Sequence, residues 1–272
     1  MIKVVTRDAR IIDLKQIWTL CFPGDEKYKQ FFFNRIYCRN NLIAAKNNDM
    51  LVGMLHMLPQ TFVSKSGERL SARYLYAIGI HPDYRGIGVG KMLVERALEL
   101  MWRRDDAVAT LVPGDDKLFN YYGQLDFEPC FVGCGYSDAQ LSLNNGKTAI
   151  YRDIPHLQAI YDNSMRGKVH VLRDEGWWRL LLDECRVTGG QVLFEGCSYI
   201  VLGPKNKVRE YCKNGVYPPF TSRGIQPYGM TRIVDVGKVR RWADCKKRHI
   251  SEQKESLTLQ VFGDAYMNLM WD

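Results

Sequence analysis

The feature that most restricts how this chain folds is a loop with glycine at every second position, residues 86, 88 and 90. An apolar run with strand character, Leu70–Ile80, ends just before Pro82. After the loop, apolar residues recur at helical spacing from Gly88 to Arg103. Glycines let a backbone lie close to a ligand, and the N–H groups at the start of a helix bind anions. This strand, loop and helix therefore predict a site for phosphate groups.

Two common phosphate-binding loops do not fit the spacing. The dinucleotide fingerprint needs G-x-G-x-x-G, and here Gly90 comes one residue too early. The loop of nucleoside triphosphatases needs four residues between its first glycine and Gly-Lys, followed by Ser or Thr. Here three residues separate Gly86 from Gly90, and Met92 stands where the hydroxyl residue belongs. The spacing argues against both classes of nucleotide site.

The pattern that fits is R-x-x-G-x-G/A after a strand that ends in x-P-x-Y. His81–Tyr84 and Arg85–Gly90 match it position by position. This segment resembles the acyl-CoA-binding motif of the GNAT superfamily of N-acetyltransferases, and the order of elements expected over residues 1–135 is also that of the family. The resemblance implies that acetyl-CoA is the acetyl donor. It implies ten cofactor-binding residues: Ile78, Gly79, Ile80, Arg85, Gly86, Ile87, Gly88, Val89, Gly90 and Lys91.

The resemblance also implies which part of CoA each group of these residues would bind. The amides from Arg85 to Lys91 would bind the pyrophosphate, and the strand end Ile78–Ile80 would pair with the pantetheine arm. In the family a bulge in this strand opens the cleft. Gly79 is a candidate for the bulge residue, and a glycine kept for packing is the alternative.

A second segment, Leu118–Phe127, resembles the F-Y-x-x-x-G-F signature of the same family. Tyr122 aligns with the tyrosine that protonates the leaving thiolate, so the resemblance implies that Tyr122 is the catalytic acid, with Tyr121 as the alternative. Asp126 stands where the family usually has glycine, and Asp also tolerates a left-handed backbone.

Amide formation also needs a neutral amine. An alkylamine has a pKa of about 10.4, so deprotonation at pH 7 costs up to ~4–5 kcal/mol, which a carboxylate or a water relay offsets. His56, Glu128 and the C-terminal carboxylate of Asp272 are the candidates for the base, and His56 also fits a structural role.

The second half of the chain resembles acetyltransferases of the enhanced-intracellular-survival type. The shared segments are Asp153–Leu157, Ile160–Tyr161, Arg173–Trp178 and Pro227–Asp235. That family acetylates amines, notably aminoglycosides, and its terminal carboxylate reaches the active site. This chain is shorter than such proteins, so we expect shortened later domains.

These patterns predict an α+β chain of two domains. Residues 1–142 would form the GNAT fold, a mixed and mostly antiparallel sheet flanked by helices. Residues 143–272 would form a smaller α+β domain, with a truncated GNAT-like unit as one interpretation. The expected function is N-acetyl transfer from acetyl-CoA to an amine of a small molecule, aminoglycoside-like or polyamine, or of a protein. The alternative is a non-catalytic protein that senses acyl-CoA and uses its basic second domain for binding.

The composition limits the classes of protein to which this chain can belong. The 272 residues are 46% hydrophobic and 25% charged, which is typical of a globular protein. The N-terminus is charged where a signal peptide needs an apolar run, so we expect a cytoplasmic protein without a membrane partner.

The eight cysteines lack metal-ligand spacing, and no metal is expected. The net charge of +8 is densest over residues 238–249. We interpret this stretch as a solvated helix face rather than a nucleic-acid surface. The sequence is compatible with a homo-oligomer.

Overall fold

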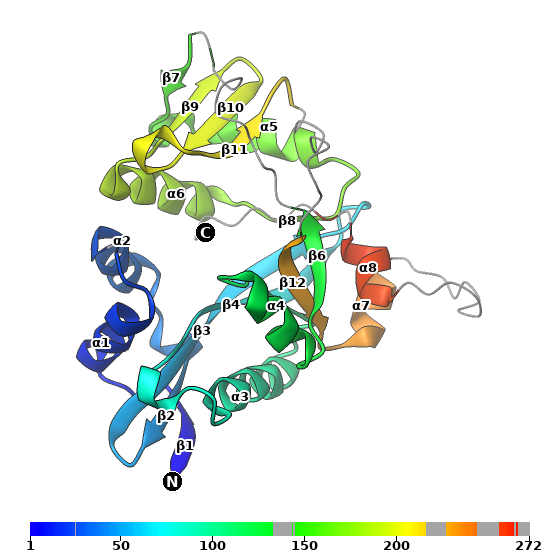
Figure 1. The fold of residues 1–272 in the computed structure, drawn as a ribbon. Helices are drawn as coiled ribbons and strands as arrows, with labels where there is room; N and C mark the ends of the chain where they lie inside the picture. Colours follow the sequence, from blue (N-terminus) through cyan, green and yellow to red (C-terminus); the bar gives the residue numbers. More distant parts are fainter. Residues whose placement is uncertain are drawn as a thin grey trace.

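The computed structural model describes residues 1–24, 26–132, 143, 145–215, 227–243, 256–263 and 265, and Figure 1 shows two sheets, each covered by helices. The larger sheet has the order β1-β2-β3-β4-β5-β12-β6, with β8 paired to the end of β3. Every pairing in it is antiparallel except β4 with β5. Its strands are β1 (Ile2–Thr6), β2 (Leu42–Asn47), β3 (Met50–Val63), β4 (Arg69–Ile80), β5 (Val108–Leu111), β6 (Glu128–Val132), β8 (His170–Val171) and β12 (Pro227–Ile233).

Helices cover both faces of this sheet. On one face, α1 (Ile11–Cys21), α2 (Glu26–Phe31), the π-helical turn η1 (Phe32–Ile36), α7 (Val236–Trp242) and α8 (Leu257–Phe262) share one apolar core. On the other face, α3 (Val89–Arg103) and α4 (Asp116–Gly123) form a second core with the sheet. The helix α3 has the apolar stripe that its sequence predicts, and its buried residues include Leu93, Ala97 and Met101.

The smaller sheet has the order β11-β10-β9-β7 and is antiparallel throughout. Its strands are β7 (Lys147–Thr148), β9 (Gln191–Glu195), β10 (Ser198–Leu202) and β11 (Val208–Cys212). The helices α5 (Ile154–Met165) and α6 (Glu175–Thr188) pack against it. The two parts of the molecule meet where α2 packs against α6, and Arg35 of the adjoining turn η1 donates to the Asp183 carboxylate of α6 at 2.6 Å. Short 3-10 turns are η2 (Arg39–Asn41), η3 (Pro82–Tyr84), η5 (Tyr151–Asp153) and η6 (Pro204–Asn206).

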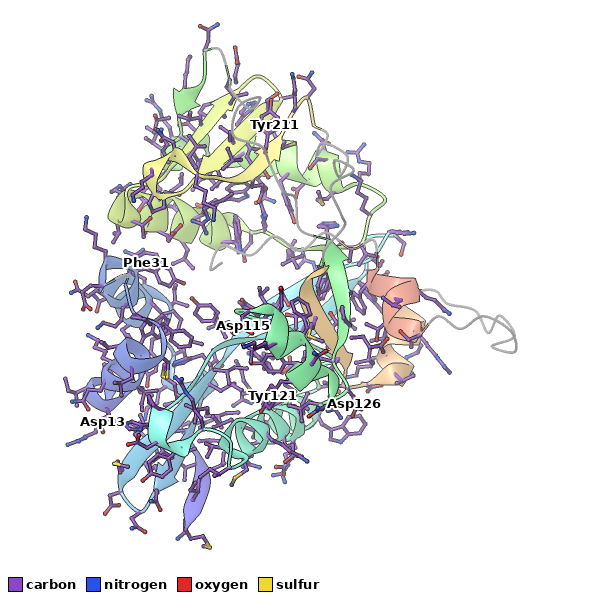
Figure 2. The ribbon with its side chains drawn as sticks, in the orientation of Figure 1. Asp13, Phe31, Asp115, Tyr121, Asp126 and Tyr211 are labelled. Carbon is purple, nitrogen blue, oxygen red and sulfur yellow. The ribbon has the colours of Figure 1, made fainter. Side chains whose placement is uncertain are left out.

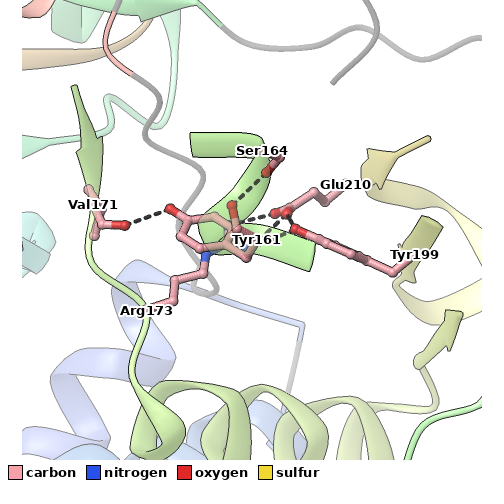
Figure 3. A network of polar contacts seen from close by, with 6 residues as sticks. All are labelled: Tyr161, Ser164, Val171, Arg173, Tyr199 and Glu210. Carbon is pink, nitrogen blue, oxygen red and sulfur yellow. Dashed lines mark hydrogen bonds and ion pairs between the residues drawn. The ribbon is translucent and has the colours of Figure 1, made fainter. Parts of the chain in front are cut away.

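A buried ion pair holds the core of the smaller part together (Figure 3). The Arg173 guanidinium donates two hydrogen bonds to the Glu210 carboxylate, both at 2.7 Å, and both side chains are almost fully buried. The Tyr199 hydroxyl also donates to Glu210. The guanidinium lies 4.3 Å from the ring centre of Tyr161 and 4.1 Å from that of Trp177. This network crosses from the segment before α6 to β11, so it ties the helices to the sheet.

The predicted fold class is confirmed: the chain is α+β, with a mixed and mostly antiparallel sheet flanked by helices and a second, smaller sheet. The sheets do not follow the predicted division at residue 142, because β12 lies between β5 and β6 of the first sheet. The sequence also predicts an irregular connection over 216–228 and a strand over Ile233–Val236. The observed strand is β12 over Pro227–Ile233, and α7 begins at Val236, while residues 216–226 lie outside the described residues. The sequence also predicts a strand over Thr148–Arg152, but the observed strand β7 ends at Thr148 and Tyr151–Asp153 form a 3-10 turn.

Candidate active site

The glycine loop leaves open space in front of the first turn of α3. Gly86 has φ +78° and Gly88 has φ +88°, a left-handed backbone that favours glycine. A Cβ atom at either position would meet nothing within 4 Å. Gly88 is also the N-cap residue of α3, and no side chain caps this helix. A large anion can therefore approach the helix start without displacing protein atoms.

The helix start is suited to a phosphate group. Among the residues that the structure describes, no acceptor is bonded to the backbone N–H groups of Gly88, Val89 or Gly90. Four such groups are free at every helix start, and they carry the positive end of the helix dipole. Lys91 and Arg85 add positive charge: Lys91 lies 3.7 Å from Glu95, and Arg85 is exposed beside the loop. The helix start and these two cations together favour an anionic ligand at this end of α3.

The strand β4 separates from β5 on the way to this loop. The two strands pair only where Ala72–Tyr74 face Val108–Thr110. Beyond Tyr74, the only strand among the described residues that pairs with β4 is β3, on its other side. The N–H of His81 donates to Val52 of β3 at 2.9 Å, so the backbone of the preceding residue, Ile80, points away from β3. In this strand end the backbone groups of Ile78 and Ile80 therefore point toward the gap where β5 has left, whereas those of Gly79 face Met54 of β3. The Ile80 carbonyl accepts hydrogen bonds from Arg85 Nε at 3.1 Å and from Cys21 Sγ at 3.2 Å.

A bulge in β4 accompanies the separation, but Gly79 is not its strained residue. The register with β3 shifts between Met54 and His56, where three residue steps of β4 oppose two of β3. Ala77 carries the left-handed φ of +48°. Gly79 pairs regularly with Met54, and a Cβ there would lie 3.2 Å from Cys21 Sγ and 3.3 Å from Phe22. Of the two explanations for Gly79, packing is therefore the one that the structure supports.

Tyr122 lies on α4, with its ring in the core between the sheet and α3. Its ring centre is 6.0 Å from that of Phe127 and 5.0 Å from that of Tyr121. Only 6% of the residue is exposed, and burial raises the pKa of the hydroxyl, an effect to which Tyr121 and Asp115 add. Within the described residues the hydroxyl has no hydrogen-bond partner. It therefore stays protonated at neutral pH, with its proton available to a ligand.

The turn after Tyr122 is braced by β12, far away in the sequence. Asp126 has φ +58°, the left-handed conformation expected where the family has glycine. Arg232 of β12 donates to the Leu125 carbonyl at 2.6 Å and lies 3.4 Å from the Asp126 carboxylate. Figure 2 shows Asp126 beyond the end of α4. Arg232 was not predicted as a site residue, because no local pattern reveals a contact that spans 107 residues.

The three candidates for the base lie in different surroundings. His56 is 1% exposed and is enclosed by the rings of Phe32, Phe33 and Tyr37, and burial lowers its pKa to about 3. This supports the structural role. The Glu128 carboxylate accepts a hydrogen bond from the hydroxyl of Ser256, the N-cap residue of α8. Asp272 lies outside the described residues.

The comparisons with known proteins agree with this geometry. The family described as "Acetyltransferase (GNAT) domain" matches residues 3–130. This part of the chain is a GNAT acetyltransferase domain. The match covers the loop, β4, β5 and α4, the elements of the candidate site. A comparison with curated protein sequences finds no match. Every helix among the described residues is too short or too polar to cross a membrane.

Solved structures share the fold well beyond this GNAT domain. A GCN5-related N-acetyltransferase from Anabaena variabilis is similar with a TM-score of 0.63 and 18% identity, over 88% of this chain and 74% of the other. Eis1 from Mycobacterium abscessus has a TM-score of 0.63 and 14% identity, over 89% and 76%. A GCN5-related N-acetyltransferase from Kribbella flavida has a TM-score of 0.62 and 12% identity, over 88% and 73%. At these identities the likeness shows the fold, which includes the smaller sheet.

Proposed function

We propose that this protein transfers the acetyl group of acetyl-CoA to a primary amine. The observation that carries the proposal is the separation of β4 from β5 beside the free N-terminus of α3. One end of this arrangement offers N–H groups to an anion, and the other offers an extended strand edge. CoA has a pyrophosphate and a peptide-like pantetheine arm in the same order. The proposed binding residues are Ile78, Gly79, Ile80, Arg85, Gly86, Ile87, Gly88, Val89, Gly90 and Lys91.

The proposed reaction is a direct attack within a ternary complex. The amine nitrogen attacks the thioester carbonyl carbon, the C–S bond breaks, the nitrogen loses a proton and the sulfur gains one. Backbone N–H groups at the open edge of β4 would polarise the carbonyl. Tyr122 would give its proton to the leaving sulfur and regain one from solvent. The raised pKa of Tyr122 supports this role, because a hydroxyl that is protonated at neutral pH can act as the acid.

The acceptor is proposed as an amine of a small molecule, aminoglycoside-like or polyamine, or of a protein. Similar folds named N-acetyltransferases support nitrogen as the acceptor atom. The test has two steps. Calorimetric titration compares acetyl-CoA with CoA and NAD, and we expect binding of the two CoA ligands only. A panel of amines is then assayed by release of the CoA thiol.

The outcomes separate the proposals. Thiol release that depends on an amine supports the enzyme. Binding of acetyl-CoA without transfer to any amine would favour a sensor of acyl-CoA. Failure to bind acetyl-CoA would contradict the assignment of the loop as a CoA site.

A further inference from the structure

Tyr121 and Tyr122 are neighbours on α4, but they serve different parts of the structure. Their rings are 5.0 Å apart and inclined by 69°. Tyr122 is buried in the core, whereas Tyr121 is only partly buried and reaches the first turn of α3. A Cβ built on Gly90 would lie 2.7 Å from the Tyr121 hydroxyl oxygen and 4.0 Å from Ile80 Cγ1. The hydroxyl thus lies where β4 ends and α3 begins.

This contact explains the third glycine of the loop. Unlike Gly86 and Gly88, Gly90 has no left-handed φ, so its backbone does not require glycine. Alanine, which the family motif allows here, would place a methyl group against the Tyr121 hydroxyl. Gly90 therefore leaves room for that hydroxyl at the helix start.

The Tyr121 hydroxyl is available as a donor at this position. Within the part of the chain that the structure describes, it makes no hydrogen bond. Burial, with a further contribution from Glu95, raises its pKa, so it stays protonated at neutral pH. The nearby N–H groups of Val89 and Gly90 are also without acceptors. One ligand oxygen could accept from the helix start and from the tyrosine together.

We propose that the Tyr121 hydroxyl donates a hydrogen bond to the pyrophosphate of CoA, and that the pair Gly90–Tyr121 selects donors that carry this group. The inference rests on the proposed function. It assigns Tyr121 to cofactor binding and leaves the proton transfer to Tyr122. The bond would be charge-assisted, since a phosphate oxygen is the acceptor.

The test compares two acetyl donors in the full-length protein. S-acetylpantetheine has the thioester and the arm but lacks the pyrophosphate. For Tyr121→Phe we expect the KM for acetyl-CoA to rise about tenfold, the effect of one such bond. The KM for S-acetylpantetheine should change less than about twofold. Tyr151→Phe is the control, because it removes a tyrosine hydroxyl that donates to Asp183 in the smaller part of the molecule, and both KM values should stay near those of the wild type.

A second variant tests the geometry. Gly90→Ala should displace the hydroxyl and raise the KM for acetyl-CoA in the wild-type background, but add little in the Tyr121→Phe background. An unchanged KM for acetyl-CoA in Tyr121→Phe would overturn the inference, and so would an equal rise for both donors. Wild-type protein that binds no acetyl-CoA would refute the proposed function itself. If the wild-type protein binds acetyl-CoA but transfers no acetyl group, Kd values for CoA and pantetheine are compared between the wild type and Tyr121→Phe in place of the KM values.

Discussion

His56 gives the most quantitative prediction, because its imidazole is enclosed by aromatic rings and its Nε2 has no hydrogen-bond partner among the described residues. Burial lowers its pKa from 6.5 to about 3. Below pH 6.5 the unfolded chain therefore binds a proton at this position that the folded chain does not. Folding stability from this group is present above pH 6.5 and is lost as the pH falls toward 3.

The size of the effect at pH 5 follows from the unfolded state. The unfolded imidazole is then ~1.5 pH units below its pKa, and each unit corresponds to about 1.36 kcal/mol, so the loss is about 2 kcal/mol. At pH 5 the folded imidazole is still neutral, so the result depends little on its own pKa. Near pH 3 the loss reaches about 4 kcal/mol.

The assay is urea denaturation of the wild type and of His56→Leu at several pH values. Leucine removes the titrating imidazole, so the difference between the two free energies of unfolding reports His56 alone. The carboxylates and the other histidines contribute equally to both proteins and cancel. Between pH 8 and pH 5 the wild type should lose about 2 kcal/mol relative to the variant. A difference that stays constant over this range would refute the reasoning. Acetyl transfer by the variant at pH 8 then tests whether His56 is the base: the structural role predicts that transfer is retained.

Three further outcomes are expected. Gly88→Val should fill the open space at the α3 start and weaken acetyl-CoA binding by calorimetry, whereas Gly67→Val, with a similar φ of +93° in a distant turn, should leave it near normal. Tyr122→Phe should lower turnover on the order of 10²-fold with little change in acetyl-CoA affinity; wild-type rates across pH would reassign the acid. Glu210→Leu should cost about 3–5 kcal/mol in urea denaturation because it leaves Arg173 charged and buried, and the double variant with Arg173→Met should cost less. Equal losses in the single and double variants would contradict this account of the pair.

The sequence by itself predicted the elements whose signals are local. The sequence predicts helices over Ile11–Cys21, Gly88–Arg103 and Lys117–Gln124. The observed helices α1, α3 and α4 begin and end within one residue of these bounds. The glycine loop was also predictable from the sequence, because left-handed glycines and a strand-to-helix turn depend on neighbours in the chain. The left-handed Asp126 was also anticipated.

Only the tertiary structure decided which distant segments complete the site. The pairing of β12 with β5 and β6, and the bond from Arg232 to Leu125, join residues about a hundred positions apart in the sequence. The division of labour between Tyr121 and Tyr122 also needed it, since adjacent residues of one helix point in directions that only packing reveals. Periodicity fixes which face of an element is apolar, but the partner that covers this face is chosen by the whole fold.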